Sequence, residues 1–429
     1  MPRWWEQFDD PLLARLVAAA QEVSPTLASA RSRVAQSRAE RTRAGAALLP
    51  QVDGTASILR GRQDFLSPLG TVASAGVQAG WEIDLFGANR AGRDAAQARL
   101  EGAEASWHDA RVSVAAEVAS VYVALRACEA QLVFTRTDAT SRGETARLTD
   151  LSAQAGFQPP AVAALSRASA AQARVQVAAQ QARCDIALKS LVALTGTAEP
   201  ALREQLAGAT SKLPEPAQIG VEAVPAQVLN QRPDLHAAAR ELVAASADVS
   251  QASAQRLPRI SLAGSISAAR FDALGVSDDG TLWQIGPLAV TLPLFDGGAK
   301  ARYDEAAALY RARLRGAVRE VEEALVQLQS TASRADDARI AIEGYDASYK
   351  ATEARFRGGL ASLFELEDAR RTAVLAQSQY IELQRERVTA WISLYRALGG
   401  GWTPADPSAA GVKAAADRTA SASHELAAK

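Results

Sequence analysis

Two parts of the chain alternate strictly between apolar and polar positions. In residues 72–85 the apolar set is Val77, Ala79, Trp81, Ile83 and Leu85. A period of two residues is typical of a β-strand with one apolar and one polar face. We therefore expect a strand over 70–86, paired with 52–64 through a turn near Ser67 to Gly70.

The same pattern recurs in the second half of the chain. There the apolar or small positions are Ile260, Leu262, Gly264 and Ile266, separated by Ser and Ala. We expect strands over 259–271 and 281–294, joined by an Asp- and Gly-rich loop over 272–280. Four half-apolar strands leave open edges, which are an aggregation hazard unless they are paired. The strands are therefore predicted to pair with strands of other subunits.

The remaining sequence predicts helices of unusual length. One begins at Asp10, a good N-cap, with Pro11 in the first turn, and continues to about Leu49. Segments 87–155 and 299–357 would each extend roughly 90–105 Å as single helices. Breaks at 156–160 and at Gly358-Gly359 are each followed by a return helix. The pattern predicts two very long helical hairpins.

The chain is also internally duplicated. Segments 25–27, 49–52, 85–87 and 193–196 match segments 233–235, 257–260, 294–297 and 397–400 in the same order. This spacing is far longer than the 20–50 residues of a solenoid repeat. We expect one protomer of two structural repeats, 11–196 and 226–402, joined by an equatorial linker at 197–225 and followed by a disordered tail at 403–429.

Composition narrows the function. The 429 residues contain 47 Lys and Arg against 48 Asp and Glu, which gives no support to nucleic-acid binding. Hydrophobic residues make up 48%, but much of this is Ala, which suits long helices that pack closely. No run of 18 apolar residues is present, so no transmembrane helix is expected. For Cys128 and Cys184 we favour buried free thiols over a disulfide, although both remain open.

Catalytic and metal-binding motifs are absent from the sequence. His108, His236 and His424 are the only histidines, and none has a second ligand at metal-binding spacing. No phosphate-binding glycine loop, nucleophile elbow or dinucleotide fingerprint occurs. We expect no cofactor and no enzyme.

Several motifs together resemble a known family. They are the segments 48–50 (Leu-Leu-Pro), 81–87 (Trp-Glu-Ile-Asp-Leu-Phe-Gly), 230–235 (Asn-Gln-Arg-Pro-Asp-Leu), 286–298 and 395–402 (Tyr-Arg-Ala-Leu-Gly-Gly-Gly-Trp). In this order they are similar to the TolC-type outer membrane efflux proteins, in the lipoprotein branch that serves resistance–nodulation–division pumps. The resemblance covers about residues 4 to 402.

The resemblance implies a fold and a set of partners. The expected fold class is mainly α with a small β part: a trimeric helical tunnel in the periplasm and a 12-stranded barrel in the outer membrane, with four strands per protomer. Expected partners are two other copies, a periplasmic adaptor, an inner-membrane pump and outer membrane lipid. Family members carry an export signal and often a lipidated cysteine. We expect both to lie outside this chain, whose first residues resemble mature sequence.

The resemblance also places a gate. Phe364, Asp368 and Arg371 share one helical face just past the second break, where relatives narrow the tunnel. Leu is common in relatives at the position of Phe364, and the matching segment of the other copy, 161–168, consists mostly of small residues and has Arg167 as its one charge. The alternative is that Phe364 packs inside the hairpin while Asp368 and Arg371 form a surface pair.

Two further surfaces follow from the resemblance. The tips would dock the adaptor, although their glycines also suit simple turns. The tip residues are Gly156, Phe157, Gly358, Gly359 and Leu360, with Ala155, Ala361 and Ser362 beside them. Trp81, Phe271 and Trp283 are candidates for aromatic belts at the membrane interface, or for packing within the barrel wall.

Three functions are compatible with these features. The first is the passive exit channel of a tripartite efflux pump for drugs or other small solutes, which we favour. The second is the outer membrane channel of a type I protein secretion system. The third is a soluble coiled-coil scaffold, against which the four amphipathic strands argue. The substrate cannot be inferred from this chain.

Overall fold

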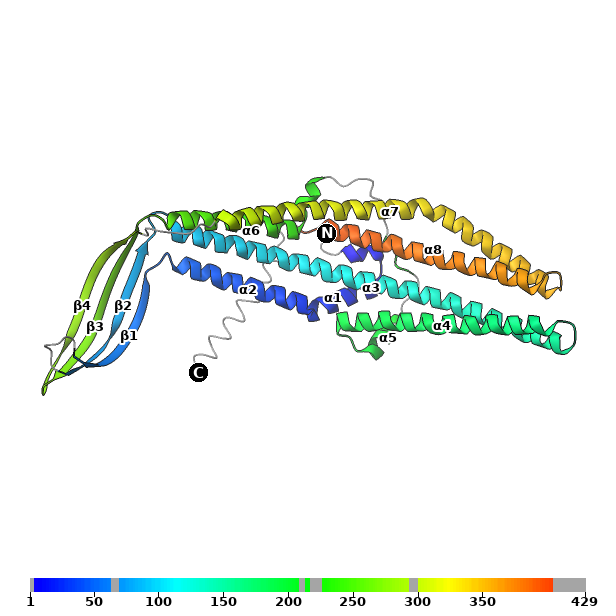
Figure 1. The fold of residues 1–429 in the computed structure, drawn as a ribbon, viewed down its shortest axis with the longest axis horizontal. Helices are drawn as coiled ribbons and strands as arrows, with labels where there is room; N and C mark the ends of the chain where they lie inside the picture. The colour runs from blue at the N-terminus through cyan, green and yellow to red at the C-terminus, as the bar shows by residue number, and fades with distance from the viewer. Residues whose placement is uncertain (1–3, 63–68, 208–212, 217–225, 293–299, 404–429) are drawn as a thin grey trace. The chain divides into compact units, whose positions relative to one another are not determined.

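The computed structural model describes residues 4–62, 69–207, 213–216, 226–292 and 300–403. Long helices dominate, and four strands form one sheet (Figure 1). The chain divides into two compact units. The first contains the chain up to Ser29, His108–Pro233 and the chain from Arg315; the second contains Ala30–Trp107 and Asp234–Leu314. Each unit therefore takes segments from both predicted repeats.

The four predicted strands are present in the second unit. They are β1 (Gln51–Gly61), β2 (Gly70–Ile83), β3 (Arg259–Ala273) and β4 (Val276–Thr291), all antiparallel and hydrogen-bonded in the order β1-β2-β3-β4. The expected turn between the first two strands falls largely outside the described residues. Within the described part of the chain, β1 and β4 are the edges of the sheet, and neither has a second partner strand.

Strand register confirms the amphipathic pattern. Directly opposed residues point to the same face of a sheet, and Val77 lies opposite Ile266, which in turn lies opposite Trp283. The alternate positions carry polar pairs such as Gln78 with Ser265. Val77, Ile266 and Trp283 are all exposed in the single chain. The sheet therefore has an apolar face that the described protomer leaves uncovered.

The loop expected over 272–280 is wrong. Strand β3 continues to Ala273 and β4 begins at Val276, so that only Leu274 and Gly275 turn the chain. Both have positive φ, 53° and 80°, which is the conformation of a tight two-residue hairpin turn. Backbone pairing extends through the Asp-rich segment because its side chains remain exposed to solvent.

The single helix expected from Asp10 to Leu49 is also wrong. It is split into α1 (Pro11–Val23) and α2 (Pro25–Ala46). Proline disfavours helical geometry in the residue before it, and Ser24 adopts φ −61° and ψ 120°. The predicted start is confirmed: the Asp10 carboxylate accepts hydrogen bonds from the amides of Leu12 and Leu13, at 2.9 and 3.2 Å.

The long helical hairpins are confirmed. The first is α3 (Ala88–Gln154) followed by α4 (Pro160–Thr195); the second is α7 (Lys300–Arg357) followed by α8 (Leu363–Ala397). Short elements complete the described chain: α5 (Glu199–Ala207), α6 (Pro233–Ala254) and 3-10 turns at Trp4–Phe8 and Ala226–Gln231. Only part of the expected linker is described, and the tail beyond 403 lies outside the described residues.

Each unit has its own core. In the first unit, large side chains of α1, α3, α4 and α8 are fully or almost fully buried, including Leu13, Tyr122, Leu191 and Ile392. In the second unit α3 and α6 meet through Ala95, Ala98 and Ala244, which are almost inaccessible. Because alanine has no bulk beyond Cβ, it lets helix backbones approach closely but contributes little apolar burial.

The preference for free thiols is wrong, because Cys128 and Cys184 form a disulfide between α3 and α4. Their Cα atoms lie 5.5 Å apart, within the range that a disulfide can bridge. The two cysteines are 56 positions apart in sequence. Their meeting depends on how α4 folds back along α3, which the local sequence pattern does not specify.

One helix qualifies the expectation about membrane-spanning helices. Among the described residues, α3 alone contains an 18-residue window that could cross a membrane by length and composition. Of that window, 44% is buried inside the chain. A helix in the core of a protein passes the same test of length and composition. Composition alone is weak evidence for a membrane span here.

Candidate functional site

Both helical hairpins of the first unit turn through short glycine-containing loops. Gly156 follows α3 with φ 80°, and Gly359 follows α7 with φ 74°, a backbone region that favours glycine. The apolar side chains beside them are open to solvent: Phe157 is 84% exposed and Leu360 is 74% exposed. The predicted tip residues thus form two turns with projecting apolar side chains.

The helix after the second turn begins with a capping box. The Ser362 hydroxyl accepts a hydrogen bond from the Glu365 amide, and the Glu365 carboxylate accepts one from the Ser362 amide at 2.7 Å. The Ser362 hydroxyl also donates to the Glu365 carboxylate at 3.0 Å. The bond from the Ser362 amide, and secondly the bond from its hydroxyl, lower the pKa of Glu365. The cap fixes where α8 starts, one residue before the candidate gate.

The predicted gate residues lie together on the exposed side of α8. Phe364 is 76% exposed and makes no buried packing within its own hairpin. One turn further along, Arg371 Nη2 lies 2.5 Å from Asp368 Oδ1, and both side chains are more than half exposed. Leu363 and Leu366, in contrast, are buried on the other side of the helix. Phe364 therefore does not pack inside the α7/α8 hairpin.

A buried arginine, Arg370, lies behind this face and was not predicted from the sequence. The Arg370 side chain is 1% exposed, and its Nη1 donates to Glu367 Oε1 at 2.7 Å. Its Nη2 donates to the hydroxyls of Ser141 and Thr145 on α3, at 3.1 and 3.2 Å. The guanidinium also lies over the ring of Tyr349 on α7, 5.5 Å from its centre. One side chain thus connects α3, α7 and α8.

Further ion pairs extend this cluster to α4. Arg142 bonds to Asp138 at 2.9 Å and to Glu367 at 2.8 Å. The Ser169 hydroxyl of α4 donates to the same Glu367 carboxylate at 2.7 Å. We name Asp138, Ser141, Arg142, Thr145, Ser169, Tyr349, Glu367 and Arg370 the tip network. The only sequence signal was helical spacing, which places Arg370 on the same face as the buried Leu363 and Leu366.

The aromatic candidates occupy different places on the sheet. Trp81 lies near the end of β2 that leads to α3, opposite Leu262, and its indole donates to the Leu48 carbonyl at 3.2 Å. Trp283 lies midway along β4, on the same face. Phe271 lies opposite Val72, nine rungs from Trp81, which places it on the polar face. The register thus separates Phe271 from the two tryptophans.

Comparison with known proteins decides the family. The family model described as "Outer membrane efflux protein" matches residues 16–197 and 224–400, which cover most of the chain. The chain is an outer membrane efflux protein. Its TolC-like fold, outer membrane location and place in an efflux system, expected from the sequence, are confirmed by this match and by the relatives below.

Similar proteins agree with this assignment. The efflux protein is 28% identical to the solvent efflux pump outer membrane protein SrpC of Pseudomonas putida, over 94% of this chain and 88% of SrpC. It is 31% identical to the outer membrane protein OprJ of Pseudomonas aeruginosa, over 75% of this chain and 68% of OprJ. The solved outer-membrane channel OprN is 28% identical, with a TM-score of 0.84 over 94% of this chain and 93% of OprN.

Outer membrane efflux proteins are channels, which are not an enzyme class. Among the described residues no group of three or more His, Cys, Asp or Glu side chains could hold a metal ion. His108 packs 5.8 Å from the ring of Trp402, and His236 accepts a hydrogen bond from Arg240. Each of these two histidines therefore contacts another side chain of the protein.

Proposed function

We propose that this efflux protein is the exit channel of a tripartite pump of the resistance–nodulation–division type, in which three copies form one conduit. The observation that carries the proposal is the uncovered apolar face of a sheet whose two edges, β1 and β4, lack partners among the described residues. In a membrane only a closed barrel satisfies every strand. Three copies of four strands would close a barrel of twelve.

Strand length supports this arrangement. The ladder of β2 and β3 covers nine rungs between Trp81 and Val72, about 30 Å of strand at 3.3 Å per residue. Strands of outer membrane barrels tilt by roughly 35–45°, which reduces this to about 23 Å along the membrane normal and fits an apolar band about 25 Å tall. The face with Val77, Trp81 and Trp283 would contact lipid. The face with Gln78 and Phe271 would line the lumen, so that Phe271 would not join a lipid-facing belt.

The gate proposal rests on exposure. The Phe364 ring is 76% exposed and lies on the same side of α8 as the exposed Asp368–Arg371 pair, so that it is open to a partner or to a conduit. Three copies of Phe364 around a threefold axis would form an apolar constriction, which blocks ions by dewetting. Asp368 and Arg371 would form a charged layer about one turn deeper. The buried tip network would hold α8 in place behind them.

The adaptor proposal rests on the turns. Phe157 and Leu360 project from them, and small residues at 155–156, 358–359 and 361–362 leave room for a partner helix to approach. The alternative function, in type I protein secretion, is not favoured, because the relatives include a protein named for a solvent efflux pump.

The experiment has two readouts. Native mass measurement of the full chain in detergent should give three copies, and a stable monomer or dimer would contradict the proposed barrel.

A photo-crosslinking amino acid at Leu360 should capture a periplasmic adaptor in cells, identified by mass spectrometry. The same crosslinker at Val326, an exposed position of α7 remote in sequence from the turns, is the control. Equal capture from both positions would remove the adaptor site from Leu360.

A further inference from the structure

The disulfide between Cys128 and Cys184 occupies a special place in the α3/α4 hairpin. From the start of α4 to Cys184 the buried residues are Ala163, Ser166, Ala170, Ala173 and Gln180. None has a large apolar side chain. The first buried leucines of α4, Leu188 and Leu191, come after the disulfide. The part of α4 between the turn and Cys184 therefore lacks the apolar packing that usually joins two helices.

Open grooves border the bond on both sides. One groove, of about 660 Å³, borders Cys128, and its wall includes Gln131, Gln176 and Arg385. A second groove, of about 420 Å³, borders Cys184 and is lined by Arg136 and Arg203, among others. Because these grooves are open, they add no packed contact between α3 and α4 beside the bond.

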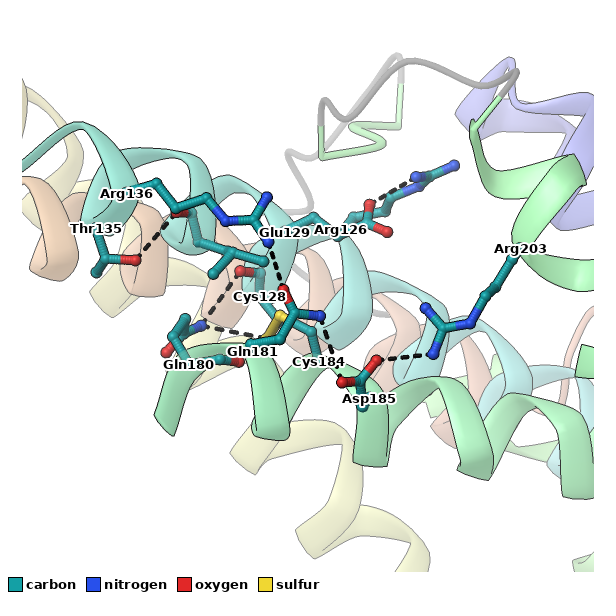
Figure 2. Close-up of a disulfide and its surroundings, with 11 residues drawn as sticks. Arg126, Cys128, Glu129, Thr135, Arg136, Gln180, Gln181, Cys184, Asp185 and Arg203 are labelled. Carbon is teal, nitrogen blue, oxygen red and sulfur yellow. Dashed lines mark hydrogen bonds and ion pairs between the residues drawn. A yellow bond between two sulfur atoms is a disulfide. The ribbon is translucent and has the colours of Figure 1, made fainter. Parts of the chain in front are cut away.

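The other contacts around the bond are polar (Figure 2). Arg136 Nη2 donates to Gln181 Oε1 at 2.6 Å, and the Gln180 amide donates to the Cys128 carbonyl at 3.2 Å. Arg203 of α5 pairs with Asp185 at 2.8 Å. The bonds of Arg136 and Arg203 are exposed, and exposed polar pairs contribute little to stability. The covalent bond is thus the strongest fastening between α3 and α4 at this level.

We propose that the Cys128–Cys184 disulfide is required for a stable α3/α4 hairpin, and that the chain is therefore a substrate of a periplasmic thiol–disulfide oxidoreductase. The family assignment supplies the compartment, because disulfides form and persist in the oxidising periplasm. The second hairpin does not need such a bond. Its α8 buries Leu363, Leu366, Ile381 and Leu383 along its length, and it contains no cysteine.

The reaction is an exchange of thiols and disulfides. One chain thiolate attacks the oxidoreductase disulfide, forms a mixed disulfide and releases one enzyme thiolate. The second chain thiolate then attacks the chain sulfur of the mixed disulfide and expels the other enzyme thiolate. The chain loses two electrons and two protons overall, and the oxidoreductase disulfide is reduced. Cys184 is only 5% exposed in the folded chain, so oxidation must precede tight packing of α4.

The test compares two hosts and two chains. The full chain and its Cys128→Ser/Cys184→Ser variant are produced in a host with its periplasmic dithiol oxidase and in a host without it. We expect the abundance of the parent chain to fall several-fold in the deficient host, with both cysteines open to alkylation. The variant should have the same low abundance in both hosts. Equal abundance of the parent chain in both hosts would overturn the proposal, as would parent chain that is fully reduced yet stable in the normal host.

If the Cys128→Ser/Cys184→Ser variant does not accumulate, the purified parent protein can be tested instead by reducing its disulfide chemically. A phosphine reductant should lower the melting temperature of the parent trimer and make its cysteines alkylatable. An unchanged melting temperature after complete reduction would contradict the requirement. Neither readout depends on conductance, so a failure of the proposed channel function would be recognised separately.

Discussion

At the scale of single residues, two glycines of one strand have opposite steric surroundings. A Cβ atom at Gly76 would lie 2.4 Å from the Ile266 carbonyl oxygen and from Ser267 Cβ, whereas a Cβ at Gly80 would meet nothing within 4 Å. Both residues belong to β2 and point to the polar face. Of these two positions, the close approach of β2 and β3 therefore requires glycine only at Gly76.

Gly76→Ala should destabilise the barrel, while Gly80→Ala should not. Overpacking of this kind costs about 1–3 kcal/mol, so that the Gly76 variant should lose its folded, heat-resistant form at a lower temperature than the parent. Electrophoretic mobility of detergent-solubilised protein against temperature measures this. A Gly80 variant that melts as early as the Gly76 variant would show that the strand spacing is not limiting.

The neighbouring arginines of α8 should also differ. Arg370→Met removes the buried guanidinium that bonds to Glu367, Ser141 and Thr145, and hydrogen bonds to a charged group contribute about 1.5–3 kcal/mol. Arg371→Met breaks an exposed pair, worth about 0–1 kcal/mol. Thermal unfolding followed by circular dichroism should show a clear loss of stability for the first variant and almost none for the second. Equal losses would mean that the tip network does not stabilise the helices.

At the scale of elements, the periodicity of the sequence predicted which strands form, but it did not predict where each of them ends. Alternation in 72–85 and in 260–266 was enough to predict β2 and β3, because each strand has one apolar and one polar face. Pairing with a neighbour decides where a strand ends, and for this reason β4 begins at Val276 inside an Asp-rich segment. Pro25 was the available signal for the break between α1 and α2.

Contacts between distant segments could not be predicted from local pattern. Arg370 and Ser141 are 229 positions apart, and their hydrogen bond depends on how the two hairpins lie side by side within the first unit. The same holds for Cys128 and Cys184. The exposed candidates Phe364, Asp368 and Arg371 came from resemblance to a family, since spacing alone shows only that they share a helical face.

The start of α8 should depend on pH. The pKa of Glu365 is lowered below its ordinary value of 4.5 by bonds from Ser362. The stabilising effect of this cap is therefore present above pH 4.5 and is lost as the pH falls through the lowered pKa. Hydrogen exchange at 358–365 should quicken below pH 4.5 beyond the chemical rate change. Glu365→Gln keeps an acceptor but does not titrate, so its exchange should lack this step; a step that persists would assign the effect to another group.

At the scale of the whole molecule, the duplication predicted from the sequence would explain why one chain has two hairpins of strands and two of helices. Each copy contributes a half-apolar strand pair, and the four strands still form an open sheet with the order β1-β2-β3-β4. The edges of β1 and β4 in the described protomer account for the proposed trimer, since closure through other copies removes them. The two turns of the first unit account for the proposed gate and docking surfaces.

The central claim is that three copies form a gated conduit, and single-channel conductance in planar lipid bilayers tests it most directly. The parent protein should insert and conduct poorly because the Phe364 ring is closed. Phe364→Ala/Asp368→Ala should conduct several times more, whereas Phe157→Ala, which removes an equally exposed ring from the other turn, should conduct like the parent. If the double variant conducts no better than the parent, or if none of the three forms channels, the account of a gated exit channel is contradicted.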